Sequence, residues 1–164
     1  MKRLLAAAGT ALLLVACSST QESAMDVYGD ANGGWNDSVN IMDLQPTALT
    51  KEFQKTGNDV IYFSFNGYSL DAQAKAELTA QADWLNANPR ALIVIEGRCD
   101  ERGTREYNLA LGERRANAAR SYLMTLGVAA NRIRTISYGK DKPVVLGSDE
   151  EAWAKNRSAT TVAY

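Results

Sequence analysis

EGRCDERGTREYNLALGERRAN, residues 96–117, joins the end of an apolar strand to a long helix through a loop that contains glycine. Thr104 is the expected N-cap of that helix, because its hydroxyl can accept a hydrogen bond from an unpaired amide of the first turn. The loop carries Asp100 and the helix carries Arg115. A carboxylate can hold an ammonium group, and a guanidinium can bind a carboxylate through two parallel hydrogen bonds. The stretch therefore predicts a site for a ligand that has both charges.

The chain around this stretch alternates between strand and helix patterns, which predicts an α/β domain. Expected strands cover residues 60–65, 92–95, 133–138 and 160–164, and expected helices cover residues 70–87, 105–126 and 150–155. Asn88 and Pro89 end the first long helix, since proline lacks an amide hydrogen and restricts the residue before it. Gly127 is the expected C′ residue of the second. The strand at 92–95 is apolar throughout, which indicates a central position in the sheet, but spacing alone leaves the strand order open.

The second long helix has an apolar stripe with small residues, which permit close approach to the sheet. Its members are Leu109, Gly112, Ala116, Ala119, Leu123 and Leu126. Arg115 precedes Ala116 and so flanks this stripe, from which it can lean toward the loop of Asp100. A solvated helix charge is the alternative, but no acidic residue stands three or four positions away from Arg115. Arg114 points further into solvent.

The beginning of the chain predicts a secretory signal over residues 1–16. Lys2 and Arg3 precede an apolar run that spans only about 20 Å as a helix, against a hydrocarbon core of roughly 30 Å. Cys17 follows a leucine, a spacer and a small residue, which resembles a bacterial lipobox whose cysteine is acylated. Several acyl chains attach a protein stably to a membrane. Ser18 implies the outer membrane by the lipoprotein sorting rule, and an ordinary signal peptide that leaves Cys17 as a free thiol is the alternative.

Residues 17–57 are expected to form a flexible, lipidated tether before a folded domain over 58–164. The segment is rich in Ser, Asp, Asn, Gly and Thr, and its apolar residues show no period. A flexible chain of about 40 residues has a mean span of roughly 35 Å and a full reach of about 130 Å. A short helix around residues 41–53, capped by Thr47 or Thr50, is the regular element expected there.

Charge and composition exclude several classes of function. Removal of the signal peptide leaves 16 basic and 19 acidic residues, so the net charge is about −3 and nucleic-acid binding is not expected. The chain has no histidine, the usual base for a cysteine or serine nucleophile and the commonest zinc ligand. We therefore expect no catalysis, no metal and no cofactor, although a wall hydrolase or a transpeptidase that uses Cys99 is the rival class. With Cys17 acylated, Cys99 has no disulfide partner and is expected to be a buried, small apolar side chain.

Residues 96–117 resemble the signature of the OmpA-like peptidoglycan-binding domains, in particular that of the peptidoglycan-associated lipoproteins of the Tol-Pal system. IYFSFNGY (residues 61–68), SYGKDKP (137–143) and KNRSATTVAY (155–164) continue the pattern in the family's order. The resemblance thus covers about two thirds of the chain. It implies an OmpA-like βαβαβ core with a mixed sheet packed by two long helices, after the lipidated tether.

The resemblance also implies a ligand and the residues that bind it. In this family the loop aspartate binds the ammonium group of diaminopimelate in the peptidoglycan stem peptide, and the helix arginine binds its carboxylate. These roles correspond to Asp100 and Arg115. Further candidates are an arginine that enters the last strand and a loop after the first strand, namely Arg157, Asn66, Gly67 and Tyr68. Plain alternatives stay open: a loop cap for Asp100, a strand-edge charge for Arg157 and a packing role at the helix entry for Tyr68.

Several positions depart from the family's pattern. Aspartates are frequent where Ser64 and Asn66 stand, a His-Ala step where Arg98 and Cys99 stand, and a second arginine where Ser158 stands. Arg98 makes the expected groove less negative and is a candidate to replace that second arginine in part.

By resemblance, the protein is an outer-membrane lipoprotein whose domain faces the periplasm and binds peptidoglycan non-covalently. It would support outer-membrane invagination at cell division, with TolB and other Tol proteins as partners. A generic wall-anchoring lipoprotein outside the Tol system is the alternative. A porin-like or motor stator protein would need a β-barrel or a spanning helix before the domain, which residues 18–57 do not supply.

Overall fold

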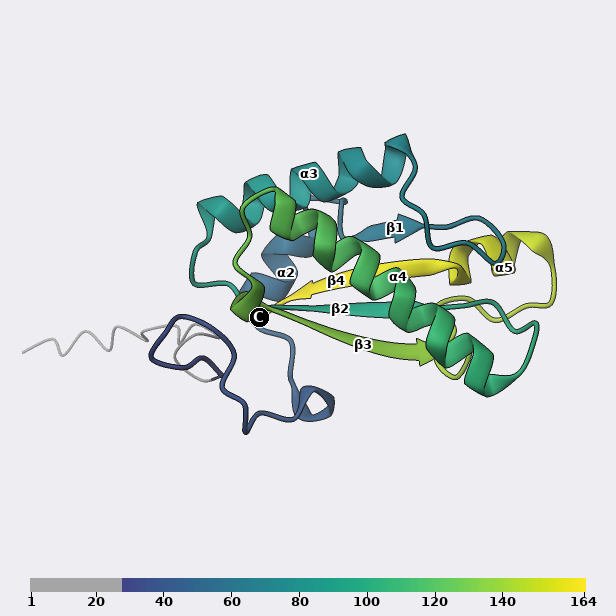
Figure 1. The fold of residues 1–164 in the computed structure, drawn as a ribbon, viewed down its shortest axis with the longest axis horizontal. Coiled ribbons are helices and arrows are strands. Elements are labelled where there is room, and N and C mark those ends of the chain that lie inside the picture. Colours follow the sequence, from purple (N-terminus) through teal and green to yellow (C-terminus); the bar gives the residue numbers. More distant parts are fainter. Residues whose placement is uncertain (1–27) are drawn as a thin grey trace, which may run out of the picture.

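The computed structural model describes residues 28–164, so the signal peptide, Cys17 and the first part of the expected tether lie outside the described residues. The elements in chain order (Figure 1) are η1 (Ile41–Asp43), α2 (Ala48–Gln54), β1 (Val60–Tyr62), α3 (Ala72–Ala87), β2 (Ile93–Arg98), α4 (Arg105–Thr125), η2 (Ala130–Arg132), β3 (Ile133–Gly139), α5 (Glu150–Asn156) and β4 (Ser158–Ala163). They confirm the expected α/β fold class. No helix within residues 28–164 is long and apolar enough to cross a membrane.

The sheet has four strands in the order β1-β4-β2-β3. β2 and β3 run parallel, whereas β4 is antiparallel to both of its neighbours, so the sheet is mixed as expected. The last strand of the chain is inserted between the first two. This order brings the last residues of β1 and β2 and the first residues of β4 together at one edge of the domain.

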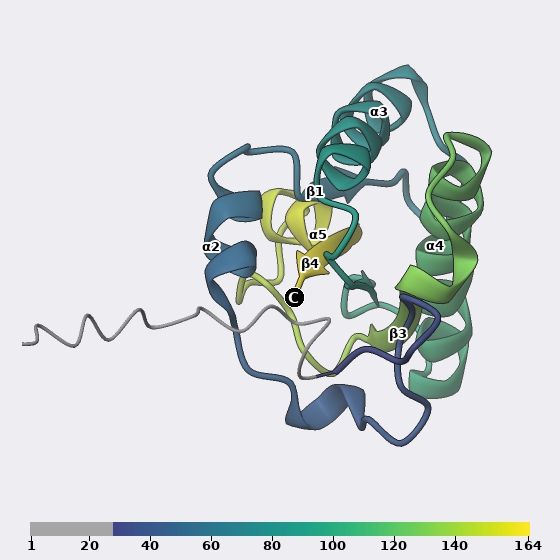
Figure 2. The ribbon, with the colours of Figure 1, turned by 90° about the vertical axis from the view of Figure 1, so that its left-hand side faces the viewer.

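Alternate residues of β2 are buried on opposite faces of the sheet, one of which is covered by α3 and α4 (Figure 2). Ile93 and Ile95 face the core formed with α3 and α4, while Leu92, just before β2, and Val94 face a second cluster with Trp35 and other aromatic residues. Successive side chains of a strand point to opposite faces, so a strand covered on both sides reads as a continuous apolar run. The central position predicted for this strand is confirmed.

Residues 28–44 correct the expectation of a free tether, because they pack on the second face of the sheet. The indole Nε1 of Trp35 donates hydrogen bonds to the carbonyls of Ile93 (3.2 Å) and Arg132 (3.1 Å). Trp35 and Leu44 are both buried there. The apolar residues of this segment show no period because those that pack on the sheet, such as Trp35 and Leu44, do so one by one and not as one face of a helix or strand.

The helix α2 belongs to the domain as well. Phe53 is fully buried, and its ring centroid lies 4.9 Å from that of Trp84 in α3. Thr47 caps α2 and forms a reciprocal capping box with Thr50, which confirms the expected cap. The described part of the expected tether is therefore part of the folded unit, and the domain begins well before residue 58.

The ends of α4 are set by local chemistry, as predicted. The Thr104 hydroxyl accepts a hydrogen bond from the amide of Tyr107 (3.2 Å). At the other end Gly127 adopts a positive φ of 94°, and the amide of Val128 donates to the carbonyl of Leu123 (3.1 Å). This arrangement pairs carbonyls of the last turn that would otherwise lack partners. α4 thus starts directly after the loop that holds Asp100.

Candidate functional site

A cavity of about 370 Å³ lies between the loop after β1, the loop after β2 and the first turns of α4. The lining residues are Phe65, Asn66, Cys99, Asp100, Arg102, Gly103, Tyr107, Asn108, Leu111 and Arg115. Three of the residues predicted from the sequence, Asp100, Arg115 and Asn66, are in this set. The fold therefore brings a carboxylate from the loop after β2 and a guanidinium from α4 to one cavity.

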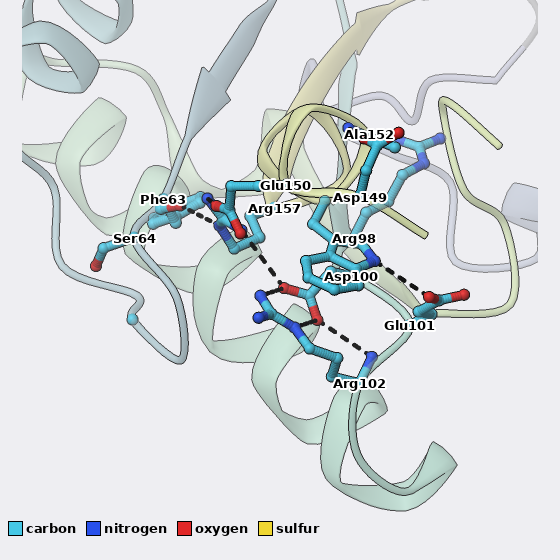
Figure 3. A network of polar contacts seen from close by, with 12 residues as sticks. Phe63, Ser64, Arg98, Asp100, Glu101, Arg102, Asp149, Glu150, Ala152 and Arg157 are labelled. Carbon is cyan, nitrogen blue, oxygen red and sulfur yellow. Dashed lines mark hydrogen bonds and ion pairs between the residues drawn. The ribbon is translucent and has the colours of Figure 1, made fainter. Parts of the chain in front are cut away.

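Asp100 lies two residues beyond β2 and is only 4% exposed. Its carboxylate accepts hydrogen bonds from the amide (3.2 Å), Nε (3.2 Å) and Nη2 (2.6 Å) of Arg102, as Figure 3 shows. The Nη1 of Arg157 lies 3.6 Å from Oδ2. Burial alone would raise the pKa of Asp100, but the hydrogen bonds of Arg102 and the charges of Arg102 and Arg157 lower it below its ordinary value. Asp100 is therefore ionised at neutral pH.

The loop around Asp100 is held by hydrogen bonds to its backbone. Asn108, on the first turn of α4, donates from Nδ2 to the carbonyls of Arg102 (2.9 Å) and Thr104 (3.0 Å). Lys140 donates from Nζ to the carbonyl of Gly103 (2.6 Å). These bonds satisfy the carbonyls of a tight turn and so fix the position of the carboxylate.

Arg115 is 1% exposed and lies on the buried face of α4, not at its flank as expected. Its guanidinium donates from Nε to the carbonyl of Gly67 (2.8 Å), from Nη1 to that of Arg98 (2.7 Å) and from Nη2 to that of Ser64 (3.2 Å). Burial lowers its pKa, an effect that the nearby Asp100 charge opposes. Arg115 thus supports the loop after β1 in addition to lining the cavity.

The buried stripe of α4 differs from the expected one in its members. Leu111 and Arg115 are buried, while Leu109 and Leu126 are only half-buried. The sequence pattern placed Arg115 outside the stripe because an arginine seldom lies in an apolar face. Three backbone carbonyls compensate its burial: those of Ser64 and Gly67, in the loop after β1, and that of Arg98, the last residue of β2.

Arg157 is buried and bridges three parts of the site. It donates from Nε to the carbonyl of Phe63 (3.1 Å) and from Nη2 to the carboxylate of Glu150 (2.7 Å). Its Nη1 faces Asp100 without forming a hydrogen bond. Arg157 stands directly before β4, and its side chain connects the loop after β1 and α5 to Asp100.

The three candidates in the loop after β1 have different positions. Asn66 lines the cavity with a positive φ of 56°, and its Oδ1 accepts a hydrogen bond from the hydroxyl of Tyr107. Gly67 contributes only its carbonyl, to Arg115. Tyr68 is exposed, is not among the lining residues, and has the guanidinium of Arg114 5.9 Å from its ring centroid. Arg114 is exposed, as expected.

Arg98 does not line the cavity, which corrects the expectation that it alters the groove. It forms an ion pair with Glu96 and donates from Nη1 to the hydroxyl of Thr160 (3.0 Å). Because side chains alternate along β2, Glu96 and Arg98 face away from α4, whereas Gly97 and Cys99 face toward it. Arg98 consequently cannot replace an arginine at the Ser158 position within the cavity.

Several cavity residues were not predicted from the sequence, above all Phe65, Arg102 and Tyr107. Arg102 stands two residues after Asp100 in the sequence, so a position near Asp100 is expected, but the sequence does not show that its guanidinium binds the Asp100 carboxylate. Phe65 had been expected to end a strand. Within residues 28–164, no group of three or more His, Cys, Asp or Glu side chains is placed to hold a metal ion.

The OmpA family model matches residues 62–157 of this chain. The chain belongs to the OmpA family. The peptidoglycan-associated lipoprotein of Pasteurella multocida (strain Pm70) is 40% identical over 164 residues, which are 100% of this chain and 98% of that protein. The protein of the same name from Haemophilus influenzae is 41% identical over 164 residues, which are 100% of this chain and 97% of that protein.

A solved structure supports the same family and fold. The crystal structure of the peptidoglycan-associated lipoprotein from Burkholderia pseudomallei has a TM-score of 0.63 and 47% sequence identity to this OmpA-family chain. The match covers 65% of this chain and 90% of that one. The expected resemblance and the expected fold class are therefore confirmed.

Proposed function

We propose that this OmpA-family protein is a lipid-anchored protein of the outer membrane that binds peptidoglycan non-covalently. The observation that carries the proposal is that Asp100 and Arg115, of opposite charge, line the same cavity. The ligand is the zwitterionic end of diaminopimelate in a stem peptide, with its ammonium group on Asp100 and its carboxylate on Arg115. Asn66, Gly67, Tyr68 and Arg157 are proposed to support this site, Gly67 and Arg157 through contacts with Arg115 and Asp100.

The chemistry of the cavity suits such a ligand. The lowered pKa of Asp100 keeps a negative charge available for an ammonium group. A guanidinium has more N–H groups than the three hydrogen bonds of Arg115 use, so N–H groups remain for a ligand carboxylate. The volume of about 370 Å³ is that of a small-molecule pocket and fits the end of a peptide side chain.

The anchor and the cellular role are proposed from the full-length similarity. Cys17 is the acylated residue, which lies outside the described residues, and the domain faces the periplasm. Relatives that are similar over the whole chain are named peptidoglycan-associated lipoproteins, which favours a role in the Tol-Pal system at cell division. TolB and other Tol proteins are then the protein partners. Copurification with TolB distinguishes this role from that of a generic wall-anchoring lipoprotein.

The binding proposal is tested with one substitution at each member of the charge pair. Asp100→Asn removes the charge with little change of shape, and Arg115→Lys keeps the charge but loses the planar fork. Loss of one partner of a desolvated pair costs about 2–5 kcal/mol, so Asp100→Asn should weaken retention on purified sacculi by about thirtyfold or more. Arg115→Lys should also weaken retention, because an ammonium group cannot bind a carboxylate through two parallel hydrogen bonds. Lysine is chosen because Arg115→Ala would leave three buried carbonyls unpaired and destabilise the fold.

Arg114→Ala is the control, since it removes a whole guanidinium from an exposed neighbour of Arg115 that does not line the cavity. Retention of this variant should stay near that of the unmodified protein, and cooperative unfolding should verify that all variants are folded. Equal losses for Arg114→Ala and Arg115→Lys, or no loss for Asp100→Asn, would refute the proposed site.

A further inference from the structure

The carboxylate of Asp100 is already covered by a cation of the same loop. Arg102 presents Nε to Oδ1 (3.2 Å) and Nη2 to Oδ2 (2.6 Å), so the guanidinium faces both oxygens side-on. This is the bidentate geometry in which a guanidinium binds a carboxylate most strongly. An ammonium group that binds Asp100 from the cavity must compete with this guanidinium for the carboxylate oxygens.

Two aromatic rings hold the guanidinium in place. Its central carbon lies 4.1 Å from the ring centroid of Phe65, in the loop after β1, and 4.1 Å from that of Trp153, in α5. Cation–π contacts of this kind are weak where water has access. The Arg102 side chain is 34% exposed and Phe65 is 62% exposed, so this arrangement lies at the mouth of the cavity and can open without disturbing the core.

The other contacts of Asp100 do not depend on the Arg102 side chain. The amide of Arg102 also donates to Oδ1 (3.2 Å), and the buried Arg157 keeps Nη1 3.6 Å from Oδ2 without a hydrogen bond. If the Arg102 side chain leaves, the carboxylate retains a backbone donor and a nearby positive charge. The carboxylate therefore keeps two of its stabilising contacts when its exposed partner moves away.

We propose that Arg102 is a latch that occupies the ammonium position of Asp100 in the free protein, and that an ammonium-bearing ligand binds by displacing it. The inference rests on the proposed function and assigns a specificity-determining role to a residue outside the charge pair. Since a ligand pays for the opening of the latch, its apparent dissociation constant is the intrinsic one divided by the open fraction. Weak cations then fail to displace the guanidinium.

The test measures binding of the tripeptide L-Ala-D-Glu-diaminopimelate to the full chain by titration calorimetry. Arg102→Ala and Arg102→Gln should both bind about tenfold more tightly, which corresponds to a latch open for about a tenth of the time. Arg105→Ala is the control, because it removes an equal charge at the start of α4, where Arg105 pairs with Asp141 (2.8 Å) and not with Asp100. Its affinity should be unchanged.

A second readout follows the latch itself by NMR. Addition of the tripeptide should move the Arg102 Nε–H resonance to the position that it has in Asp100→Asn, where the ionic partner is missing. The same peptide with an acetylated side-chain amine should leave the resonance in place. Unchanged or weaker binding of the Arg102 variants, or a resonance that does not move on binding, overturns the latch.

The two proposals fail in distinguishable ways. If the unmodified protein does not bind the tripeptide, or if Asp100→Asn binds it equally well, the proposed function is wrong and the latch is wrong with it. If binding depends on Asp100 but falls in Arg102→Ala, the proposed function stands, the latch is wrong, and Arg102 is a direct ligand contact.

Discussion

Cys99 is the nucleophilic side chain of the cavity, and its surroundings keep it unreactive. Burial raises the pKa of its thiol to about 11, although the charge of Arg115 acts in the opposite direction. Its Sγ lies 3.3 Å from the carbonyl of Asn108. A thiolate is the reactive form of cysteine, and at neutral pH this group is a thiol. The expectation of a buried, small apolar side chain is confirmed.

We therefore predict that Cys99 resists alkylation in the folded protein. Because the pKa is raised, the thiolate forms only as the pH rises toward 11, so iodoacetamide at pH 7–8 should modify Cys99 far more slowly than in the unfolded chain. Mass spectrometry of native and denatured samples measures this ratio. Cys99→Ala should keep sacculus binding within about tenfold, or about 1.4 kcal/mol. Rapid labelling, or loss of binding in a folded Cys99→Ala protein, would contradict an inert thiol.

At the scale of elements, the contact of β2 with α4 positions the cavity. A Cβ atom added to Gly97 would lie 1.9 Å from the carbonyl oxygen of Gly112, so the two backbones meet without an intervening side chain. The small residues of α4 predicted this close approach. Gly97 lies three residues before Asp100, and any displacement of the helix there would shift the carboxylate relative to Arg115.

Gly97→Ala should consequently destabilise the protein strongly. Overpacking in a core costs about 1–3 kcal/mol or more, and backbone cannot yield as a side chain does, so we expect a loss of about 3 kcal/mol or more in unfolding free energy. Gly127→Ala is the comparison, because nothing lies within 4 Å of its added Cβ and only the positive φ opposes the change, at about 1–2 kcal/mol. Denaturant unfolding measures both. A smaller loss at Gly97 than at Gly127 would show that the helix and strand can separate freely.

The end of α3 depends on a side chain from a distant element. Arg132, in η2, is buried and donates from Nη2 to the carbonyls of Leu85 (3.1 Å) and Asn88 (2.8 Å) and from Nε to that of Ala91 (2.9 Å). Carbonyls at the end of a helix lack partners within it, and a cation there is favourable. Asn88 and Pro89 were expected to end this helix, but the partner of its last carbonyls could not be read from the sequence.

For the whole molecule, the segment before β1 determines how much of the sheet is covered. Trp35 packs against Tyr164, with ring centroids 5.9 Å apart, beside Leu92 and Val94 on the face opposite α3 and α4. A flexible tether would leave this apolar face exposed to water. The segment therefore completes the domain.

Trp35→Ala should lower the unfolding free energy by about 3–5 kcal/mol, since it removes a buried indole and its two hydrogen bonds. Sacculus binding below the melting temperature should persist, because Trp35 is not in the cavity lining. Leu146→Ala is the control at an exposed apolar position and should change stability by no more than about 0.5 kcal/mol. Thermal unfolding of the three proteins decides whether the segment stabilises the domain or lies loosely on it.

Structural features that depend on neighbours a few residues away can be predicted from the sequence alone. The caps of α4 at Thr104 and Gly127 rest on hydrogen bonds within a turn, and the apolar run at the start of β2 reflects burial on both faces of the sheet. The pair of Asp100 and Arg115 was readable because one loop and one helix carry both residues. These local patterns, together with the motifs in their order, were sufficient for the fold class and the family.

Contacts between residues far apart in the sequence become known only from the tertiary structure. The position of β4 between β1 and β2, the packing of residues 28–57, and the three carbonyls on Arg115 join parts of the chain far apart in the sequence. Asp100 and Arg102 are near neighbours in the sequence. The guanidinium of Arg102 is nevertheless held over the carboxylate by Phe65 and Trp153, which belong to other parts of the chain. Such contacts depend on the burial and hydrogen bonding of the whole domain, and no periodic pattern in the local sequence predicts them.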